Sequence, residues 1–114
     1  MFVETKREGE TTIEPWRKVL LDAADYIEKH GWCQGRIGNA GDGVCAVGAM
    51  WMAFDGTIPK QANWVKDRAV DQAYRAMCNY VMCNYVRSYP AEWNDEPGRT
   101  AAEVTAAMRE CAAQ

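Results

Sequence analysis

Eleven consecutive residues, VCAVGAMWMAF at positions 44–54, contain no charged side chain, and this run constrains the fold more than any other feature. The run is too short to span a bilayer, which takes about 20 apolar residues. A helix that is apolar on every side is found in a protein interior. The run therefore predicts a buried central helix, with Asp42 as its capping residue. Small side chains at Cys45, Gly48 and Ala49 are expected to let a neighbouring helix approach closely.

A glycine-rich stretch, GWCQGRIGNAGDG at 31–43, precedes this run and is expected to be a loop that holds at most a short hairpin. Upstream of it, residues 15–30 predict an amphipathic helix. Pro15 suits the first helical position, and Gly31 suits the left-handed residue that follows the last turn. Apolar residues repeat at helical spacing and give one buried stripe, made of Trp16, Val19, Leu20, Ala23 and Ile27.

The chain from residue 63 to residue 89 predicts a third, long helix, which ends there because Pro90 disfavours helix at the residue before it. Its second half contains the tandem CNYVM–CNYV at 78–86. The five-residue repeat does not match the helical period, so apolar residues are spread around the helix. We expect this half to be covered on several sides or to meet a partner, including a second copy in a homodimer.

Residues 90–99 are expected to form a loop, after which Thr100 and Glu103 have the spacing of a capping box. The last helix then buries one face, made of Val104, Ala107, Met108 and Cys111. No segment shows the alternation that is typical of a strand. The sequence therefore predicts an all-α, compact single-domain bundle of about four helices, with the glycine-rich loop between the first two. We expect the domain at residues 13–114, after a flexible arm at residues 1–12.

Composition and charge exclude several classes of partner. The 114-residue chain has a net charge of −3 and its 13 Lys and Arg residues are scattered, so no basic patch for nucleic acid is expected. No apolar run approaches the length of a membrane span, and the charged N-terminus does not resemble a secretory signal. We therefore expect a cytoplasmic protein with no nucleic-acid or membrane partner. Its five cysteines are expected to stay reduced and mostly buried.

The stretch that holds His30, Cys33 and Cys45 raises the question of a catalytic or metal site. Gly31 is expected to break the helix between His30 and Cys33, so the sequence does not enforce their contact. Cys45 lies near a helix N-terminus, which lowers a thiol pKa, but within a helix expected to be buried. The cysteines lack the paired spacing of a zinc site, and the loop lacks the lysine and hydroxyl residue of a phosphate loop. No metal and no cofactor is expected.

Three segments carry a resemblance to a known family: LLDAADYIEKHGWCQG, GVCAVGAM and EWNDEPGRTAAEV. Their order and content resemble a family of small proteins of unknown function from bacterial and phage genomes, over residues 16–108. The resemblance implies a shared fold and a bacterial or phage setting, but no established activity. Small acidic proteins in such genomes often bind host proteins, including defence systems. An accessory protein that inhibits a host protein is therefore the expectation.

We expect a non-enzymatic protein-interaction module. In an antiparallel bundle, the turn after the first helix and the turn before the last fall at one end, which brings the two loops together. Tryptophan is favoured at binding hot spots, so this end is the expected contact surface. In the alternative interpretation the WND loop only closes the bundle, with Trp93 packed inside. The expected partner-binding residues are Trp32, Gln34, Arg36, Trp93, Asn94, Asp95 and Arg99.

Two other functions stay open. One is a small cysteine-dependent hydrolase or transferase that uses Cys33 or Cys45, with His30 as the candidate base. The other is a small-ligand or metal-binding regulator. An enzyme requires a solvent-open thiol with a base in reach, whereas an interaction module presents exposed apolar side chains without convergent polar groups.

Overall fold

The computed structural model of the chain describes residues 13–39, 41–58, 68–86 and 89–114. This part contains five helices: α1 (Pro15–His30), α2 (Ala46–Asp55), α3 (Arg68–Tyr85), α4 (Pro90–Asn94) and α5 (Ala101–Ala113). No strand occurs among the described residues, and the prediction of an all-α single domain is confirmed. The expected arm at residues 1–12 lies outside the described residues. No helix in the described ranges is long and apolar enough to cross a membrane.

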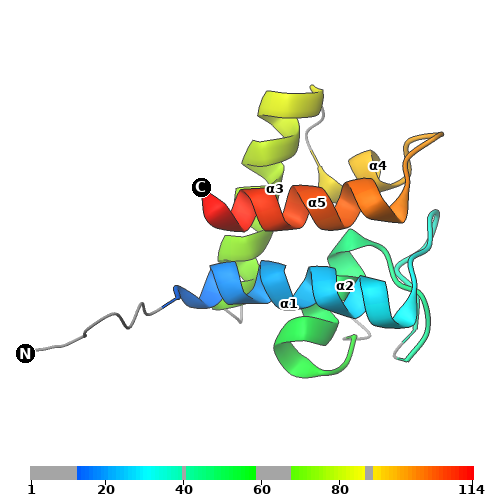
Figure 1. Ribbon diagram of the computed structural model, residues 1–114, viewed down its shortest axis with the longest axis horizontal. Helices are drawn as coiled ribbons and strands as arrows, with labels where there is room; N and C mark the ends of the chain where they lie inside the picture. Colours follow the sequence, from blue (N-terminus) through cyan, green and yellow to red (C-terminus); the bar gives the residue numbers. More distant parts are fainter. Residues whose placement is uncertain (1–12, 40, 59–67, 87–88) are drawn as a thin grey trace, which may run out of the picture.

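The helices α1 and α5 lie side by side and run in opposite directions, while α3 crosses behind both of them (Figure 1). The helix α2 packs against α1 and α3, and the short α4 packs against α2 and α3. The core lies between these elements. Leu20, Met50, Met77 and Met108, from α1, α2, α3 and α5 in turn, have no exposed surface. The predicted stripe of α1 is confirmed except at Trp16, which is only partly buried at the edge of the core.

Local sequence signals set the ends of α1 and α5 as predicted. Pro15 is the first residue of α1, and Gly31 follows its last turn, donating its N–H to the carbonyl of Ile27 at 2.8 Å. Gly31 has a positive φ of +107°, but its ψ of 173° differs from the left-handed helical conformation that the sequence predicted. At the start of α5, Thr100 Oγ1 accepts the N–H of Glu103 at 3.2 Å, and the Glu103 carboxylate accepts the N–H of Thr100 at 3.0 Å. These contacts confirm the capping box, which satisfies donors that the helix leaves free.

Side chains on the surface fix α1 against α5. Arg109 of α5 donates to Asp25 at 2.8 Å and to both oxygens of Glu28 at 2.7 and 2.8 Å. At the other end, Arg17 of α1 donates to the carbonyls of Ala112 and Gln114 at 2.7 and 2.8 Å. Exposed ion pairs contribute little to stability, so their main effect is on the relative position of the two helices.

The start of α2 differs from the prediction. Cys45, not Asp42, is the capping residue, and its sulfur accepts the N–H of Gly48 at 3.5 Å. The physical reason is a pairing of distant backbone segments, because the N–H of Val44 donates to the carbonyl of Gly31 at 3.3 Å. This pairing holds Val44 in an extended conformation, so the helix begins only at Ala46.

The neighbour of Gly48 also differs from the prediction. A Cβ atom at Gly48 would lie 2.5 Å from the carbonyl oxygen of Ile37, so the close neighbour is the glycine-rich loop and not another helix. The sequence predicted that this helix is buried on all sides. Only the first part of α2 is, because Phe54 near its end is 39% exposed. The central helix therefore serves as the surface on which the loop is folded.

The third helix is shorter than predicted at its C-terminal end. It ends at Tyr85 because Val86 adopts a left-handed conformation with φ +56°, and its expected start at residue 63 lies outside the described residues. Tyr89 is extended, as the residue before a proline should be, with φ −128°. Pro90 then begins α4, where the sequence predicted only a loop.

Candidate functional site

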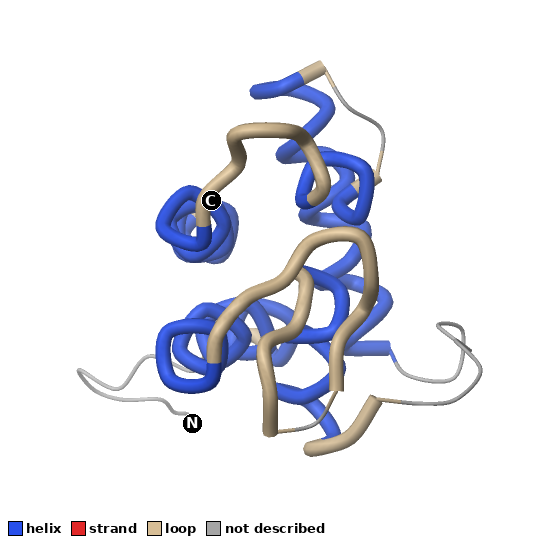
Figure 2. Tube along the Cα trace, turned by 90° about the vertical axis from the view of Figure 1, so that its right-hand side faces the viewer, coloured by secondary structure: helices blue, strands red, loops and turns tan. Residues whose placement is uncertain are grey.

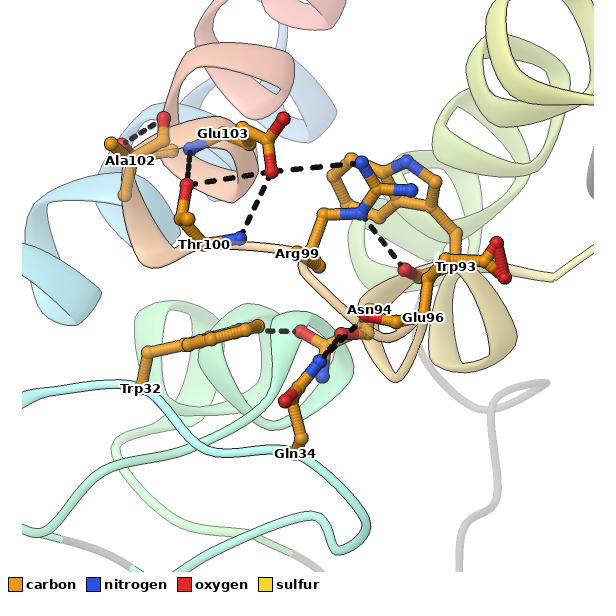
Figure 3. Close-up of polar contacts among 10 residues, drawn as sticks. Trp32, Gln34, Trp93, Asn94, Glu96, Arg99, Thr100, Ala102 and Glu103 are labelled. Carbon is orange, nitrogen blue, oxygen red and sulfur yellow. Dashed lines mark hydrogen bonds and ion pairs between the residues drawn. The ribbon is translucent and has the colours of Figure 1, made fainter.

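The loop after α1 and the loop before α5 meet at one end of the molecule, as predicted (Figure 1 and Figure 2). A short hydrogen bond joins them. Trp32, in the first loop, donates its indole Nε1 to Asn94 Oδ1 at 2.6 Å, across 62 residues of sequence (Figure 3). Asn94 is the last residue of α4, so this helix carries the central side chain of the contact.

Asn94 has no exposed surface, and its amide uses its full hydrogen-bonding capacity inside the protein. Its Oδ1 also accepts the N–H of Ala46, the first residue of α2, at 2.9 Å. Its Nδ2 donates to the carbonyl of Cys33 at 3.1 Å and to Asp95 Oδ1 at 3.0 Å. One side chain thus ties the glycine-rich loop and the start of α2 to the end of α4.

Two more side chains complete this contact. Gln34 Nε2 donates to the carbonyls of Asn94 and Glu96, each at 3.0 Å, and Asp95 Oδ1 accepts the N–H of Gly35 at 2.9 Å. We call the group of Trp32, Gln34, Asn94 and Asp95 the polar junction. Its hydrogen bonds run between parts of the same chain, so they hold the fold together.

Arg99 packs against two aromatic rings that also contact each other, those of Trp93 and Tyr85, whose centres lie 5.3 Å apart. Figure 3 shows Arg99 beside Trp93, next to the polar junction. Its guanidinium carbon lies 4.7 Å from the centre of the Trp93 ring and 4.8 Å from that of Tyr85, and its side chain is only 10% exposed. Its Nε donates to the carbonyl of Trp93 at 3.1 Å. Trp93 itself has no exposed surface, and its indole N–H has no hydrogen-bond partner among the described residues.

The structure places the seven predicted partner-binding residues in these two loops and at the end of α4, but it corrects the role expected of some of them. Trp93 and Asn94 are buried, so neither presents a surface to a partner. These contacts agree with the alternative interpretation, in which the WND loop closes the bundle. Arg36 differs, because it is exposed and its guanidinium has no hydrogen bond or ion pair within the described ranges. Partner binding by this end of the molecule stays a prediction.

The cysteine and histidine candidates do not form a nucleophile and base. His30 lies against the ring of Tyr26, with 4.4 Å between ring centres, and Cys33 Sγ donates to the carbonyl of Arg36 at 3.4 Å. Burial raises the pKa of the Cys33 thiol, the charge of Arg36 partly opposes this, and the carboxylate of Asp95 is a lesser cause of the rise. Burial also raises the pKa of Cys45, although the N–H groups of the α2 start oppose this. Both thiols therefore favour the protonated form, which is a poor nucleophile.

Metal binding finds no support in the part of the chain that the structure covers. No group of three or more His, Cys, Asp or Glu side chains there is arranged to hold an ion. The five cysteines are free thiols, of which Cys45 and Cys111 are buried and Cys83 is exposed.

The sequence left open whether the second half of the third helix is covered or meets a partner, and it did not predict which residues at the C-terminal end of α3 are exposed. Met82 is 50% exposed and Val86 is 84% exposed, with the exposed Cys83 between them. We call these three residues the α3 end. The tandem repeat at 78–86 was the available signal, since it predicted a helix with more apolar faces than one bundle can cover. The sequence predicted that this half of the helix is either covered within the protein or meets a partner. Because the α3 end is exposed, we expect it to meet a partner.

The chain belongs to a family of unknown function, DUF6197, which it matches over residues 11–114. No curated protein and no solved structure matches the chain. Membership of this family assigns no activity, so function has to be argued from the described side chains.

Proposed function

We propose that the protein is a non-enzymatic protein-interaction module and that its contact surface is the α3 end. The observation that carries this proposal is the conformation of Val86, which combines a positive φ of +56° with a side chain that is 84% exposed. A left-handed conformation costs a residue other than glycine about 1–2 kcal/mol. An exposed side chain gains almost no burial energy, so within the described residues the Val86 side chain does not compensate for this cost. A partner that covers Val86 would remove its side chain from water, and the free energy gained would offset the cost of the left-handed conformation.

The charge around the α3 end also suits an interface. From Ala76 to Val86 the sequence AMCNYVMCNYV contains no Asp, Glu, Lys or Arg, although charged residues make up 25% of the chain. Covering a charged group requires its removal from water, which is costly unless the partner pairs with it. A partner that covers residues 76–86 removes no charged side chain of this segment from water. Interface centres are depleted of charge in the same way.

A groove beside the α3 end favours a second copy of the chain as the partner. The groove has a volume of about 310 Å³ and runs between α3, the start of α1 and the end of α5. Its lining side chains include Trp16, Asn79, Cys83 and Cys111, none of which is charged at neutral pH. A projecting apolar side chain next to a neutral groove permits a two-fold contact, in which each copy inserts Val86 into the groove of the other. Elsewhere the net charge of −3 opposes self-association.

The wider setting of the proposal comes from the resemblance in motifs. We carry forward the expectation of a cytoplasmic accessory protein of bacteria or their phages that acts on a host protein. In this proposal the dimer formed through the α3 end is the species that meets the host protein. The α3 end then forms the contact between the two copies, and the host protein binds a different surface of the dimer.

Sedimentation velocity over a concentration series tests the contact surface. The parent protein is expected to shift from monomer to dimer as its concentration rises, and Val86→Gly is expected to weaken the dimer at least tenfold. Because glycine relieves the left-handed strain, the same variant is expected to unfold at a higher temperature. If Val86→Gly weakens the dimer but raises the unfolding temperature, then the valine side chain serves the contact between copies and not the folding of the monomer.

Two further variants sharpen this test. Met82→Glu places a charge in the interface and is expected to abolish the dimer, whereas Phe54→Ala removes an apolar side chain that is exposed elsewhere, on α2, and should leave the dimer intact. A parent protein that stays monomeric at all concentrations would contradict the self-association. Equal weakening by Phe54→Ala and Val86→Gly would show that the α3 end is not the contact.

A further inference from the structure

A cleft on the surface beside the polar junction is built from four separate segments. It has a volume of about 290 Å³, at the lower limit of pockets that hold small molecules. The glycine-rich loop contributes Arg36 and Ile37, α2 contributes Val47, and α3 contributes Tyr74. The fourth segment is α4 and the residue after it, with Ala91 and Asp95. A cleft of this size has room for a small molecule such as a single amino acid.

Two opposite charges line this cleft without pairing. No ion pair joins Arg36 to Asp95, and the Arg36 guanidinium makes no hydrogen bond or ion pair among the described residues, although its charge acts on the nearby Cys33 thiol. Asp95 is held in place through Oδ1, which accepts the N–H of Gly35 at 2.9 Å and Nδ2 of Asn94 at 3.0 Å. Its Oδ2 accepts no hydrogen bond within the described ranges, so one carboxylate oxygen is available to a ligand.

The rest of the cleft wall is largely apolar. Ile37 of the loop is 38% exposed, and Val47 at the start of α2 also lines the cleft. Ala91 presents only a methyl group on the side of α4. A ligand with an aliphatic group gains free energy by covering these side chains, because apolar surface is removed from water.

A second cleft on the same molecule shows why the separation of charges matters. It has a volume of about 330 Å³ and lies between α1, the end of α2 and α3. It too is lined by one cation and one carboxylate, Lys18 and Asp22, but these pair with each other at 2.5 Å. Charges that neutralise each other leave nothing for a charged ligand to bind. The cleft beside the polar junction is different because its charges stay apart.

We infer that the cleft at Arg36 and Asp95 binds a free α-amino acid with an aliphatic side chain. The carboxylate of the ligand would pair with Arg36, its ammonium group with Asp95 Oδ2, and its side chain would lie against Ile37 and Val47. A simple anion is repelled by Asp95, and a simple cation is repelled by Arg36. A zwitterion satisfies both groups at once. This inference does not rest on the α3 end or on self-association.

The polar junction supports this site by holding its parts still. Gln34 donates to the carbonyls of Asn94 and Glu96, which fixes the loop two residues before Arg36 against the segment that carries Asp95. A site whose charged groups are already positioned loses less conformational entropy when a ligand binds. The hydrogen bonds that close the bundle therefore hold Asp95 and the loop backbone near Arg36 in place on the two sides of the cleft.

Isothermal titration calorimetry with L-leucine tests the inference directly. Leucine is expected to bind the parent protein. Leucinamide, which lacks the carboxylate, and 4-methylpentanoate, which lacks the ammonium group, are expected to bind at least tenfold more weakly. Arg36→Gln and Asp95→Asn are each expected to weaken leucine binding at least tenfold. Asparagine keeps the oxygen that accepts the N–H of Gly35, so Asp95→Asn should remain folded.

Matched controls separate this site from general effects. Lys18→Gln alters the second cleft and is expected to leave leucine binding unchanged, while Ala91→Trp fills the first cleft and should abolish it. Leucine should also slow the labelling of the Cys45 thiol, because Cys45 lines the cleft. Absence of leucine binding at millimolar concentration would overturn the inference. Binding of 4-methylpentanoate as tight as that of leucine, or a loss caused by Lys18→Gln, would overturn it too.

Discussion

The polar junction and the α3 end are opposite in both chemistry and exposure. At the junction the polar side chain of Asn94 has no exposed surface, while at the α3 end the apolar side chain of Val86 is 84% exposed. The sequence favoured the junction for recognition because it holds tryptophans and polar groups. The structure shows that the junction uses those groups to hold the fold together. The difference shows that tryptophan and amide side chains can be used up within the fold, so residue type alone does not separate a contact surface from a structural contact.

The largest expected effect comes from Asn94→Ala in the polar junction. The change leaves the indole N–H of Trp32, the N–H of Ala46 and the carbonyl of Cys33 without their partner. Each buried polar group left unsatisfied costs about 1–3 kcal/mol, so the free energy of unfolding should fall by about 3–5 kcal/mol. Urea denaturation measures it. The matched control is Asn84→Ala, an exposed residue of α3 whose amide donates only to the carbonyl of Tyr80, and its effect should be small.

Thiol labelling compares the two regions in one unmodified protein. Cys33 and Cys45 lie at the junction, whereas Cys83 lies at the α3 end and is exposed. We expect Cys83 to react about a hundredfold faster than the buried Cys45, which reacts only after local opening, and also faster than the partly buried Cys33. Burial raises the pKa of Cys33 and Cys45 above the usual thiol value of 9.0, so their labelling should keep accelerating above that pH. Mass spectrometry of quenched samples identifies the sites. Fast labelling of Cys33 would instead support the cysteine-enzyme alternative.

Trp32→Phe is expected to have an intermediate effect on the junction. The ring stays in place, but Asn94 Oδ1 loses one of its two donors and keeps the N–H of Ala46. Because the acceptor retains a partner, the loss of unfolding free energy should be about 1 kcal/mol. Thermal unfolding followed by circular dichroism measures it. A loss as large as that of Asn94→Ala would mean that packing of the indole, and not its hydrogen bond, holds the loop.

The smallest expected effect, of opposite sign, belongs to Val86→Gly at the α3 end. Glycine adopts a φ of +56° without strain, so the monomer should gain about 0.5–1 kcal/mol of unfolding free energy. The control Met82→Gly lies inside α3 and should lose about 1 kcal/mol, because glycine is a poor residue in a helix interior. Both are measured at concentrations where the protein is monomeric. A loss of stability in Val86→Gly would show that the valine side chain stabilises the monomer.

Local signals made much of the fold predictable. The ends of α1 and α5 follow from Pro15, Gly31 and the pair of Thr100 and Glu103, all of which act within a few residues. The start of α2 was not predictable in this way. Its position depends on the pairing of Val44 with Trp32. The sequence around Asp42, the predicted capping residue, carries no signal of this pairing. The helix α4 was missed because five residues are too few to show a helical repeat.

The sites were predictable only in part, for a related reason. The position of the two loops at one end followed from the antiparallel arrangement, but burial of Trp93 depends on rings that come from α3 and on Arg99. The cleft is even harder to predict from the sequence. Arg36, Tyr74 and Asp95 come from separate segments of the chain, and no spacing between them indicates a shared site.

The pairing of α1 with α5 has a consequence for the order in which the protein is made. The bonds of Arg17 and Arg109 join residues that are 81 to 97 positions apart, so α1 leaves the ribosome long before its partner helix exists. Until α5 emerges, the apolar stripe of α1 lacks its cover on that side. At a synthesis rate of about 5–20 residues per second this interval lasts several seconds. Nascent chains of this protein are therefore expected to recruit chaperones until α5 is released.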